Sequence, residues 1–247
     1  MTKNYETFAS VYDAIMDDSL YDAWTDFSLR HFPKKAKGTQ LLELACGTGI
    51  QSVRFAQAGF AVTGLDLSQE MLDIAAKRAA SAKVAIDFVA GNMLDLSGVG
   101  SFDLVTCYSD SLCYLADEVE MGDTFAQVYA HLNEGGTFIF DVHSVHQTDE
   151  VFPGYSYHEN ADDFAMVWDT YEDEAPHSVV HELTFFIQDE DGRFTRYDEI
   201  HEERTYDLLT YDILLEQAGF KNVKIYADFE DKEPMETSKR WFFVGRK

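Results

Sequence analysis

The segment Leu41–Gly49 (LLELACGTG) constrains this chain most, because an apolar stretch runs directly into a Gly-x-Gly turn. We expect a short buried strand over 41–44, a tight turn, and a helix over Ile50–Ala58 that Gly59 ends. Glycine adopts positive φ and lets the backbone approach a ligand without a Cβ in the way. The helix N-terminus adds unpaired N–H groups at the same place. The segment therefore predicts a site for a nucleoside-like cofactor.

Strand and helix patterns alternate after this turn as far as His143. Short, uniformly apolar strands between helices are typical of a parallel sheet with helices on both faces. We therefore expect an α/β fold with a Rossmann-like sheet. The expected elements are strand Phe60–Leu65, helix Gln69–Ala80 capped by Ser68, strands Val84–Val89 and Phe102–Cys107, helix Glu118–Leu132 capped by Asp117, and strand Thr137–Val142.

The pattern changes over 144–206, where we expect an inserted antiparallel β layer. The segment resembles successive strands at Val167–Tyr171, Val179–Gln188, Arg193–Ile200 and His201–Tyr206, with a hairpin turn at Asp189–Gly192. The main fold is expected to resume over 207–247. Its expected elements are a helix over Leu208–Gln217 and strands at Phe220–Tyr226 and Trp241–Gly245.

Charge and cysteine content narrow the function. The chain has 19 basic and 45 acidic residues, a net charge of −26, which opposes direct binding to nucleic acid or to an anionic membrane. Without a signal peptide or an apolar run long enough to span a bilayer, the chain is expected to be cytoplasmic. Its cysteines, Cys46, Cys107 and Cys113, lack metal-ligand spacing and are expected to be reduced thiols. Nothing in the sequence indicates an oligomeric state.

Two cofactor classes use a glycine turn after the first strand of such a sheet. A dinucleotide places its pyrophosphate on a Gly-x-Gly-x-x-Gly loop, but Ser52 occupies the third glycine position. Glu43 ends the strand, where its carboxylate would repel a pyrophosphate and attract an ammonium group. S-adenosylmethionine fits better, because it lacks phosphate and carries an α-amino group and a sulfonium.

The next two strands carry residues suited to the adenosine. Asp66 ends the second strand, where a carboxylate can accept hydrogen bonds from both ribose hydroxyls. Asn92 and Met93 follow the third strand and can bond the adenine edge through a side-chain oxygen and a backbone N–H. The apolar side chains of Leu67, Met71 and Met93 could enclose the ring.

These motifs together resemble those of class I S-adenosylmethionine-dependent methyltransferases. The resemblance rests on Glu43–Gly49, Gly64–Ser68, Gly91–Met93 and Phe102–Val105, in that order. It covers Leu41–Val142 and resumes over Leu208–Lys247, since the family ends in a helix and a reversed strand pair. Two departures are small: Ala45 replaces a loop glycine, and Asn92 stands where many members have Asp.

The resemblance implies a methyltransferase core over 39–143 and 207–247, with S-adenosyl-L-methionine as cofactor. It implies a helical lid over 1–38, although the aromatic residues there could equally be core residues. The implied cofactor-binding residues are Glu43, Ala45, Cys46, Gly47, Gly49, Asp66, Leu67, Met71, Asn92, Met93, Tyr108, Asp110, Tyr12, Tyr21 and Trp24.

Three residues are candidates for contact with the methyl acceptor. Tyr108 and Asp110 follow the fourth strand, where the family binds the methionine part of the cofactor; the alternative is a turn that only caps backbone groups. His143 follows the fifth strand and could act as a general base. Although His143 and His146 form an H-x-x-H pair, no third ligand is evident, so we expect no metal.

The resemblance implies in-line methyl transfer, and a small-molecule acceptor is expected. The inserted layer 144–206 is expected to form the acceptor wall, because ligands bind at the carboxyl ends of the strands. The acidic runs Asp189–Asp191, Asp198–Glu203 and Asp228–Glu233 are interpreted as solvated faces, or as a pocket rim that favours neutral or cationic acceptors. Two other functions stay open: a catalytically silent S-adenosylmethionine-binding sensor or partner subunit, and a nicotinamide-dependent oxidoreductase.

Overall fold

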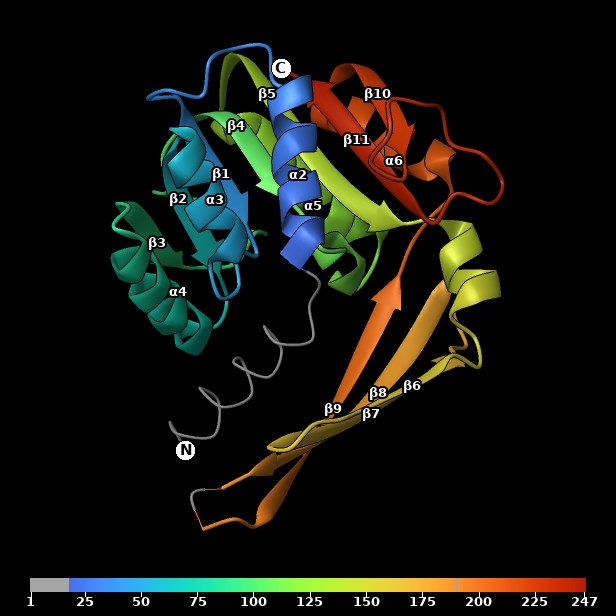
Figure 1. Cartoon of the computed structure of the whole chain (residues 1–247). Coiled ribbons are helices and arrows are strands. Elements are labelled where there is room, and N and C mark those ends of the chain that lie inside the picture. Colours follow the sequence, from blue (N-terminus) through green and yellow to red (C-terminus); the bar gives the residue numbers. More distant parts are fainter. Residues whose placement is uncertain (1–17, 190) are drawn as a thin grey trace.

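The structure is a computed structural model that describes residues 18–189 and 191–247. It contains a seven-stranded sheet and a separate four-stranded sheet. Helices pack on the larger sheet, and the smaller one projects beyond its edge (Figure 1). Both the α/β core and the added antiparallel layer agree with the prediction.

The seven-stranded sheet has the order β10-β11-β5-β4-β1-β2-β3. Five strands, β1 to β5, are mutually parallel, and only β11 runs antiparallel to both of its neighbours. This confirms the predicted mostly parallel sheet with a reversed last strand. The strands are β1 Gln40–Leu44, β2 Ala61–Asp66, β3 Ile86–Ala90, β4 Phe102–Cys107, β5 Leu132–His143, β10 Lys221–Ala227 and β11 Arg240–Arg246.

Helices cover both faces of this sheet, and two apolar cores result. Trp24, Phe27 and Phe55 lie in the core on the face covered by α2 and α3, while Phe125 and Tyr211 lie in the core under α5 and α6. The helices are α2 Asp18–His31, α3 Ile50–Ala58, α4 Gln69–Ala82, α5 Glu118–His131 and α6 Leu208–Ala218. None of the helices in the described part of the chain could cross a membrane, since none is both apolar and long enough.

Local capping explains where several helices begin. The Ser68 hydroxyl accepts a hydrogen bond from the Met71 N–H, and the Asp117 carboxylate accepts two from the first turn of α5. Gly59 ends α3 with φ 106°, a conformation that glycine adopts without strain. These three predictions are therefore confirmed.

The four-stranded sheet has the order β6-β7-β8-β9 and is antiparallel throughout. Its strands are β6 Ser156–Asn160, β7 Phe164–Glu172, β8 Ser178–Gln188 and β9 Phe194–Arg204. A π-helical turn, η2 Gln147–Val151, precedes it, and a 3-10 turn, η1 Ser111–Tyr114, follows β4. The sequence prediction missed β6 and both turns.

The prediction of two separate strands over 193–206 was wrong. One strand, β9, pairs with β8 without interruption from Phe194, opposite Gln188, to Arg204, opposite Ser178. The charged residues along β9 alternate in direction. Asp198 is exposed on one face, whereas Glu203 is buried on the other.

Alternation gives the four-stranded sheet two unlike faces. One face, called the inner face below, carries a partly buried apolar cluster that also contacts Met71 at the start of α4. The opposite face is exposed at Val167, Tyr171 and Ile200. The inner face therefore turns toward the loops of the large sheet. The cluster comprises Met166, Phe185 and Ile187, with Tyr157, Phe164, Trp168, Leu183 and Tyr197 packed against them.

The close packing at Gly49 predicts that this position tolerates no side chain. A Cβ at Gly49 would lie 2.7 Å from the Ala75 Cβ, whereas a Cβ at Gly98 would meet nothing within 4 Å. Both glycines have left-handed φ, 76° and 82°, so both alanine variants should lose about 1–2 kcal/mol from backbone strain. Gly49→Ala should lose about 1–3 kcal/mol more from overpacking. Urea unfolding measures both, and equal losses would contradict the packing argument.

Candidate functional site

The carboxyl ends of the parallel strands meet at one edge of the large sheet. The chain reverses strand order between β1 and β4, which is where open α/β sheets bind ligands. The loop after β1 has three residues of positive φ: Ala45 at 52°, Gly47 at 52° and Gly49 at 76°. A Cβ at Gly47 would meet no atom within 4 Å, so this part of the loop faces open space.

Asp66 fixes the glycine loop from the neighbouring strand β2. The Gly47 N–H donates to Asp66 Oδ2 at 2.8 Å, and the Ser68 N–H donates to Oδ1 at 2.9 Å. Each carboxylate oxygen has a second lone pair, so two hydroxyls could still bind. The structure thus gives Asp66 a role in holding the glycine loop, and its contact with the ribose hydroxyls stays a prediction.

Glu43 lies at the end of β1 and is buried, at 4% exposure. The Ser52 hydroxyl donates a short hydrogen bond to its Oε2. Burial, together with the nearby charge of Asp66, raises the pKa of Glu43 to about 8, against the hydrogen bond from Ser52. The Glu43 carboxyl is therefore mostly protonated at neutral pH.

The predicted adenine-binding residues occupy three different environments. Leu67 is 72% exposed. The exposed Asn92 accepts a hydrogen bond from the Leu94 N–H at 3.0 Å, which fixes its side chain in a turn. Met93 packs against the core under α5 and α6, and Met71 against the inner face. The loop residue Cys46 is buried and, like Cys107 and Cys113, is a free thiol.

The aromatic candidates lie in the core under α2. Tyr108 is buried, its hydroxyl is 2.6 Å from the Ser28 hydroxyl, and its ring stacks on Trp24 with centroids 5.9 Å apart. Burial holds the pKa of Tyr108 well above its usual value. Trp24 is a core residue at 1% exposure, and Tyr21 packs edge-on against it. Tyr12 lies outside the described residues, so the lid over 1–38 stays a prediction.

A buried ion cluster joins the ends of β4, β5 and β11. Arg240 pairs with both Asp110 and Asp141 through Nη1. The Trp24 indole N–H also donates to Asp141 at 2.8 Å. Burial raises the pKa of Asp141 to about 6 despite Arg240, whereas the charges of Arg240 and His143 outweigh burial and lower that of Asp110. Asp110 is therefore a fixed anion at the carboxyl edge of the sheet.

The cluster continues into the four-stranded sheet. His143 Nε2 lies 3.2 Å from Asp110 Oδ2 and 3.3 Å from Glu203 Oε2, and Glu203 Oε1 lies 3.8 Å from His181 Nε2. The Trp168 indole and Thr170 hydroxyl both approach His181 Nδ1, at 3.1 and 2.8 Å. Charged groups thus connect the carboxyl edge of the large sheet to β9, and Glu203 and His181 extend the polar contacts to β8.

The charge of His143 bears on its predicted role as a base. Burial lowers its pKa, but Asp110 and Glu203 outweigh burial and raise the pKa to about 9. His143 is therefore an imidazolium at neutral pH and cannot accept a proton. His143 therefore acts as a counter-ion to Asp110 and Glu203 rather than as a general base. No group of three or more His, Cys, Asp or Glu over residues 18–189 and 191–247 is arranged to hold a metal ion.

Sequence reasoning missed Arg240, Asp141, Glu203 and His181. One signal was present: Asp141 interrupts the apolar strand Phe138–Val142, and a carboxylate in such a strand needs a buried partner. Its partner Arg240 is 99 residues away in the chain, so the pairing itself could not be read from the sequence.

Comparisons with known proteins agree with this fold and site. A family model described as a methyltransferase domain matches residues 41–136. A methyltransferase-family protein of Geobacillus sp. (strain WCH70) is 43% identical over 98% of this chain and 99% of its own length. A glycine/sarcosine N-methyltransferase of Halorhodospira halochloris is 32% identical over 57% of this chain and 53% of its own length. The structure of an S-adenosylmethionine-dependent methyltransferase from Clostridium acetobutylicum has a TM-score of 0.85 and 27% identity, covering 98% of each chain.

The chain therefore belongs to the methyltransferase family, and its core is the Rossmann-like sheet of that family. It is an S-adenosylmethionine-dependent methyltransferase. The oxidoreductase and the silent binding module find no support in these relatives.

The ion cluster predicts a large stability loss when its cation is removed. Arg240→Met leaves Asp141 with no cationic partner and Asp110 with His143 alone, which should cost about 3–5 kcal/mol. Arg193 pairs with Asp191 at the surface and is 84% exposed, so Arg193→Met should change stability by less than about 0.5 kcal/mol. Urea unfolding of both variants checks the contrast. A small loss for Arg240→Met would show that the cluster is not a closed network of charges.

Proposed function

We propose that this enzyme transfers a methyl group to a small molecule bound between the strand ends of the large sheet and the inner face of the four-stranded sheet. The observation that carries this proposal is the apolar inner face itself. It reaches Met71, only five residues beyond Asp66, and so borders the cofactor edge. The opposite face of the same sheet is solvent-exposed.

The residues at the cofactor edge fit S-adenosylmethionine. Open space at Gly47 admits the amino-acid part, and Glu43 can ionise to pair with its ammonium group. Asp66 retains acceptor lone pairs for the ribose hydroxyls. Leu67 offers an exposed apolar surface for the adenine ring, and Asn92 is exposed after the neighbouring strand β3. Because S-adenosylmethionine lacks phosphate, none of these positions needs a basic side chain to bind it.

The bound cofactor would supply a methyl group on a positively charged sulfur. The protein's contribution is to hold the acceptor in line with that group and to exclude water, which can account for most of the rate enhancement. The buried ions Asp110 and His143 fix the edge of the sheet on which this alignment depends. Tyr108 and Asp110 stay candidates for contact with the reacting groups.

Charge and relatives support a small neutral or cationic acceptor. The net charge of −26 opposes polyanionic acceptors such as nucleic acids. The relative from Halorhodospira halochloris acts, by its name, on glycine and sarcosine, which are small amines. The inner face adds the acidic side chains Glu159, Glu199 and Glu203, which favour a cation over an anion.

The pKa of Glu43 predicts proton release on cofactor binding. The carboxyl is mostly protonated at pH 7, because its pKa is about 8. A bound ammonium group lowers that pKa, so S-adenosylhomocysteine should release up to roughly one proton per site. Titration calorimetry at pH 7, in buffers that differ in ionisation enthalpy, counts the released protons. Glu43→Gln should release none.

Adenosine is the matched control for this measurement, because it lacks the amino-acid part and should release no proton from wild type. Equal proton release by wild type and Glu43→Gln would show that Glu43 is not the ammonium partner. Failure of both S-adenosylmethionine and S-adenosylhomocysteine to bind would contradict the cofactor assignment as a whole.

Two tyrosines on opposite faces of the inserted sheet test the acceptor site. Tyr197 is half-buried on the inner face, and Tyr171 is 50% exposed on the outer face. Tyr197→Ala should reduce methyl transfer at least tenfold and leave S-adenosylhomocysteine affinity unchanged, whereas Tyr171→Ala should change neither. The assay follows labelled methyl groups from S-adenosylmethionine into a deproteinised, low-mass bacterial extract. Equal transfer by both variants would place the acceptor elsewhere.

A further inference from the structure

A second polar contact joins the four-stranded sheet to the cofactor edge, apart from the buried ion cluster. The Tyr114 hydroxyl lies 3.3 Å from His201 Nδ1, and His201 Nε2 lies 2.8 Å from Glu199 Oε2. The rings of Tyr114 and His201 meet edge-on, with centroids 5.8 Å apart. Hydroxyl, imidazole and carboxylate thus follow one another in a chain.

The hydrogen bonds define the roles of the two ring nitrogens of His201. A carboxylate only accepts hydrogen bonds, so His201 must donate its Nε2–H to Glu199. Nδ1 of the neutral ring is then the nitrogen that can take a proton, and the Tyr114 O–H donates to it. A carboxylate that orients an imidazole toward a hydroxyl is the arrangement by which proteins activate a hydroxyl for proton transfer.

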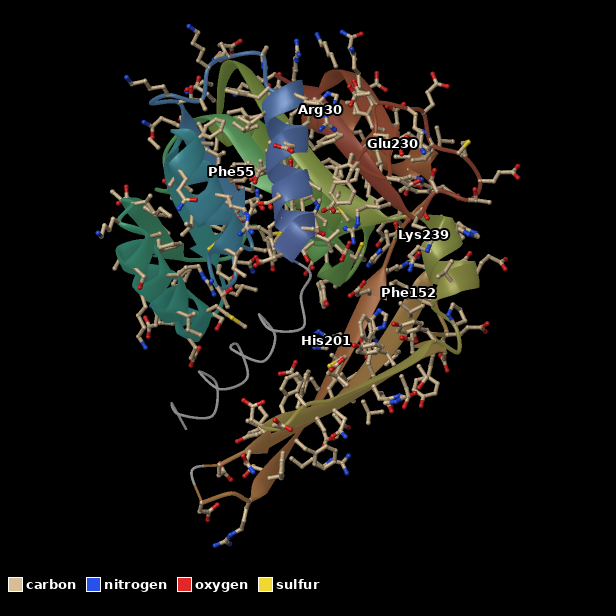
Figure 2. The ribbon with its side chains drawn as sticks, in the orientation of Figure 1. Arg30, Phe55, Phe152, His201, Glu230 and Lys239 are labelled. Carbon is tan, nitrogen blue, oxygen red and sulfur yellow. The ribbon has the colours of Figure 1, made fainter. Side chains whose placement is uncertain are left out.

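This group borders the space proposed for the acceptor. Tyr114 ends η1, the turn that follows β4 and the loop containing Asp110, and β9 packs on this turn. His201 lies on the side of the inserted sheet that faces the core (Figure 2). Tyr114 is 49% exposed and the His201 side chain 29%, so a small molecule can approach both.

The other two histidines near this edge are unsuited to taking a proton from an acceptor. His143 already carries a proton, as its raised pKa shows, and only 10% of its side chain is exposed. His181 is 3% exposed at its side chain, and both Trp168 and Thr170 approach its Nδ1. Of these three, only His201 combines an oriented ring with access from solvent.

We propose that Tyr114, His201 and Glu199 form a relay that takes the proton lost by the methyl acceptor. The inference rests on the proposed function, since it needs the acceptor at the inner face. It also narrows the acceptor class: the nucleophile reaches the enzyme as a hydroxyl or as an amine that still carries a proton. Tyr114 contacts the acceptor, and His201 and Glu199 are positioning residues that hold the proton.

The step balances in atoms and charge. As the bond from the acceptor O or N to the methyl carbon forms, the sulfur–methyl bond breaks and its electron pair stays on sulfur. The acceptor proton passes to the Tyr114 oxygen while the Tyr114 hydroxyl proton moves to His201 Nδ1. Tyr114 is again a phenol at the end, and the His201 imidazolium lies against the Glu199 carboxylate. The sulfonium charge has been replaced by the imidazolium charge, and solvent later removes the proton.

The test compares four variants of the full-length enzyme: His201→Ala, Tyr114→Phe, Glu199→Gln and the control His158→Ala. His158 lies on the exposed outer face of the same sheet. The assay measures transfer of labelled methyl groups from S-adenosylmethionine to the deproteinised, low-mass bacterial extract. His201→Ala should lose about 100-fold or more, the usual contribution of a positioned proton acceptor, and free imidazole should restore part of it. His158→Ala should transfer like wild type.

Two readouts besides transfer complete the experiment. All four variants should bind S-adenosylhomocysteine with wild-type affinity in calorimetry, which shows that they fold. Nitrogen-15 NMR of the histidines should show His201 protonated at Nε2 and unprotonated at Nδ1, and Glu199→Gln should weaken that preference. Tyr114→Phe should lose transfer without any change in the His201 tautomer.

Each other outcome overturns an identifiable claim. Wild-type transfer by His201→Ala overturns the relay. A loss that imidazole does not restore assigns His201 a structural role and also overturns it. If wild type binds S-adenosylhomocysteine but transfers no label to the extract, the proposed small-molecule function fails, and the relay fails with it.

Discussion

The structure depends on a pair of carboxylates that share one arginine. Asp141 is buried and Asp110 is partly buried, and Arg240 between them offsets the cost of holding both as anions. Because the three residues come from the β4–η1 loop, β5 and β11, their pairing fixes the order in which these elements meet. Asp110 then holds His143, and His143 holds Glu203 of the second sheet. The position of the four-stranded sheet is therefore set by charge as well as by apolar packing.

Asp66 and Glu43, the two acidic residues beside the glycine loop, differ in burial and in hydrogen-bond partners, and their charge states differ as a result. Asp66 is half-buried and bound by two backbone N–H groups, which suits a permanent acceptor that shapes the loop. Glu43 is buried with one hydroxyl partner, so its pKa is raised and its charge is suppressed. A neutral Glu43 avoids an unpaired buried charge at the end of β1. A glutamate at the surface would already be ionised at neutral pH, so a bound cation could not change its charge.

Local signals predicted the fold well, since hydrophobic periodicity and caps act over a few residues. Helix Ile50–Ala58 and strand Phe102–Cys107 have the predicted bounds. The site was harder, because its contacts span the whole chain. Even so, a period of two along β4 places Tyr108 on the same face as Leu104, in the core under α2. The predicted split of β9 was wrong because continuous pairing with the long strand β8, a long-range contact, holds the whole segment as one strand.

Three histidines at one edge show why residue type alone could not assign a base. His143 lies between two carboxylates and is held as a cation, and His181 is enclosed by Trp168, Thr170 and Glu203. His201 stands in an acidic run that the sequence suggested was a solvated face, yet strand alternation turns it inward while Asp198 and Glu202 point to solvent. The most accessible of these three rings therefore belongs to the segment with the weakest functional signal. Proton transfer depends on the orientation and access of a ring, and both arise only when β9 packs on η1.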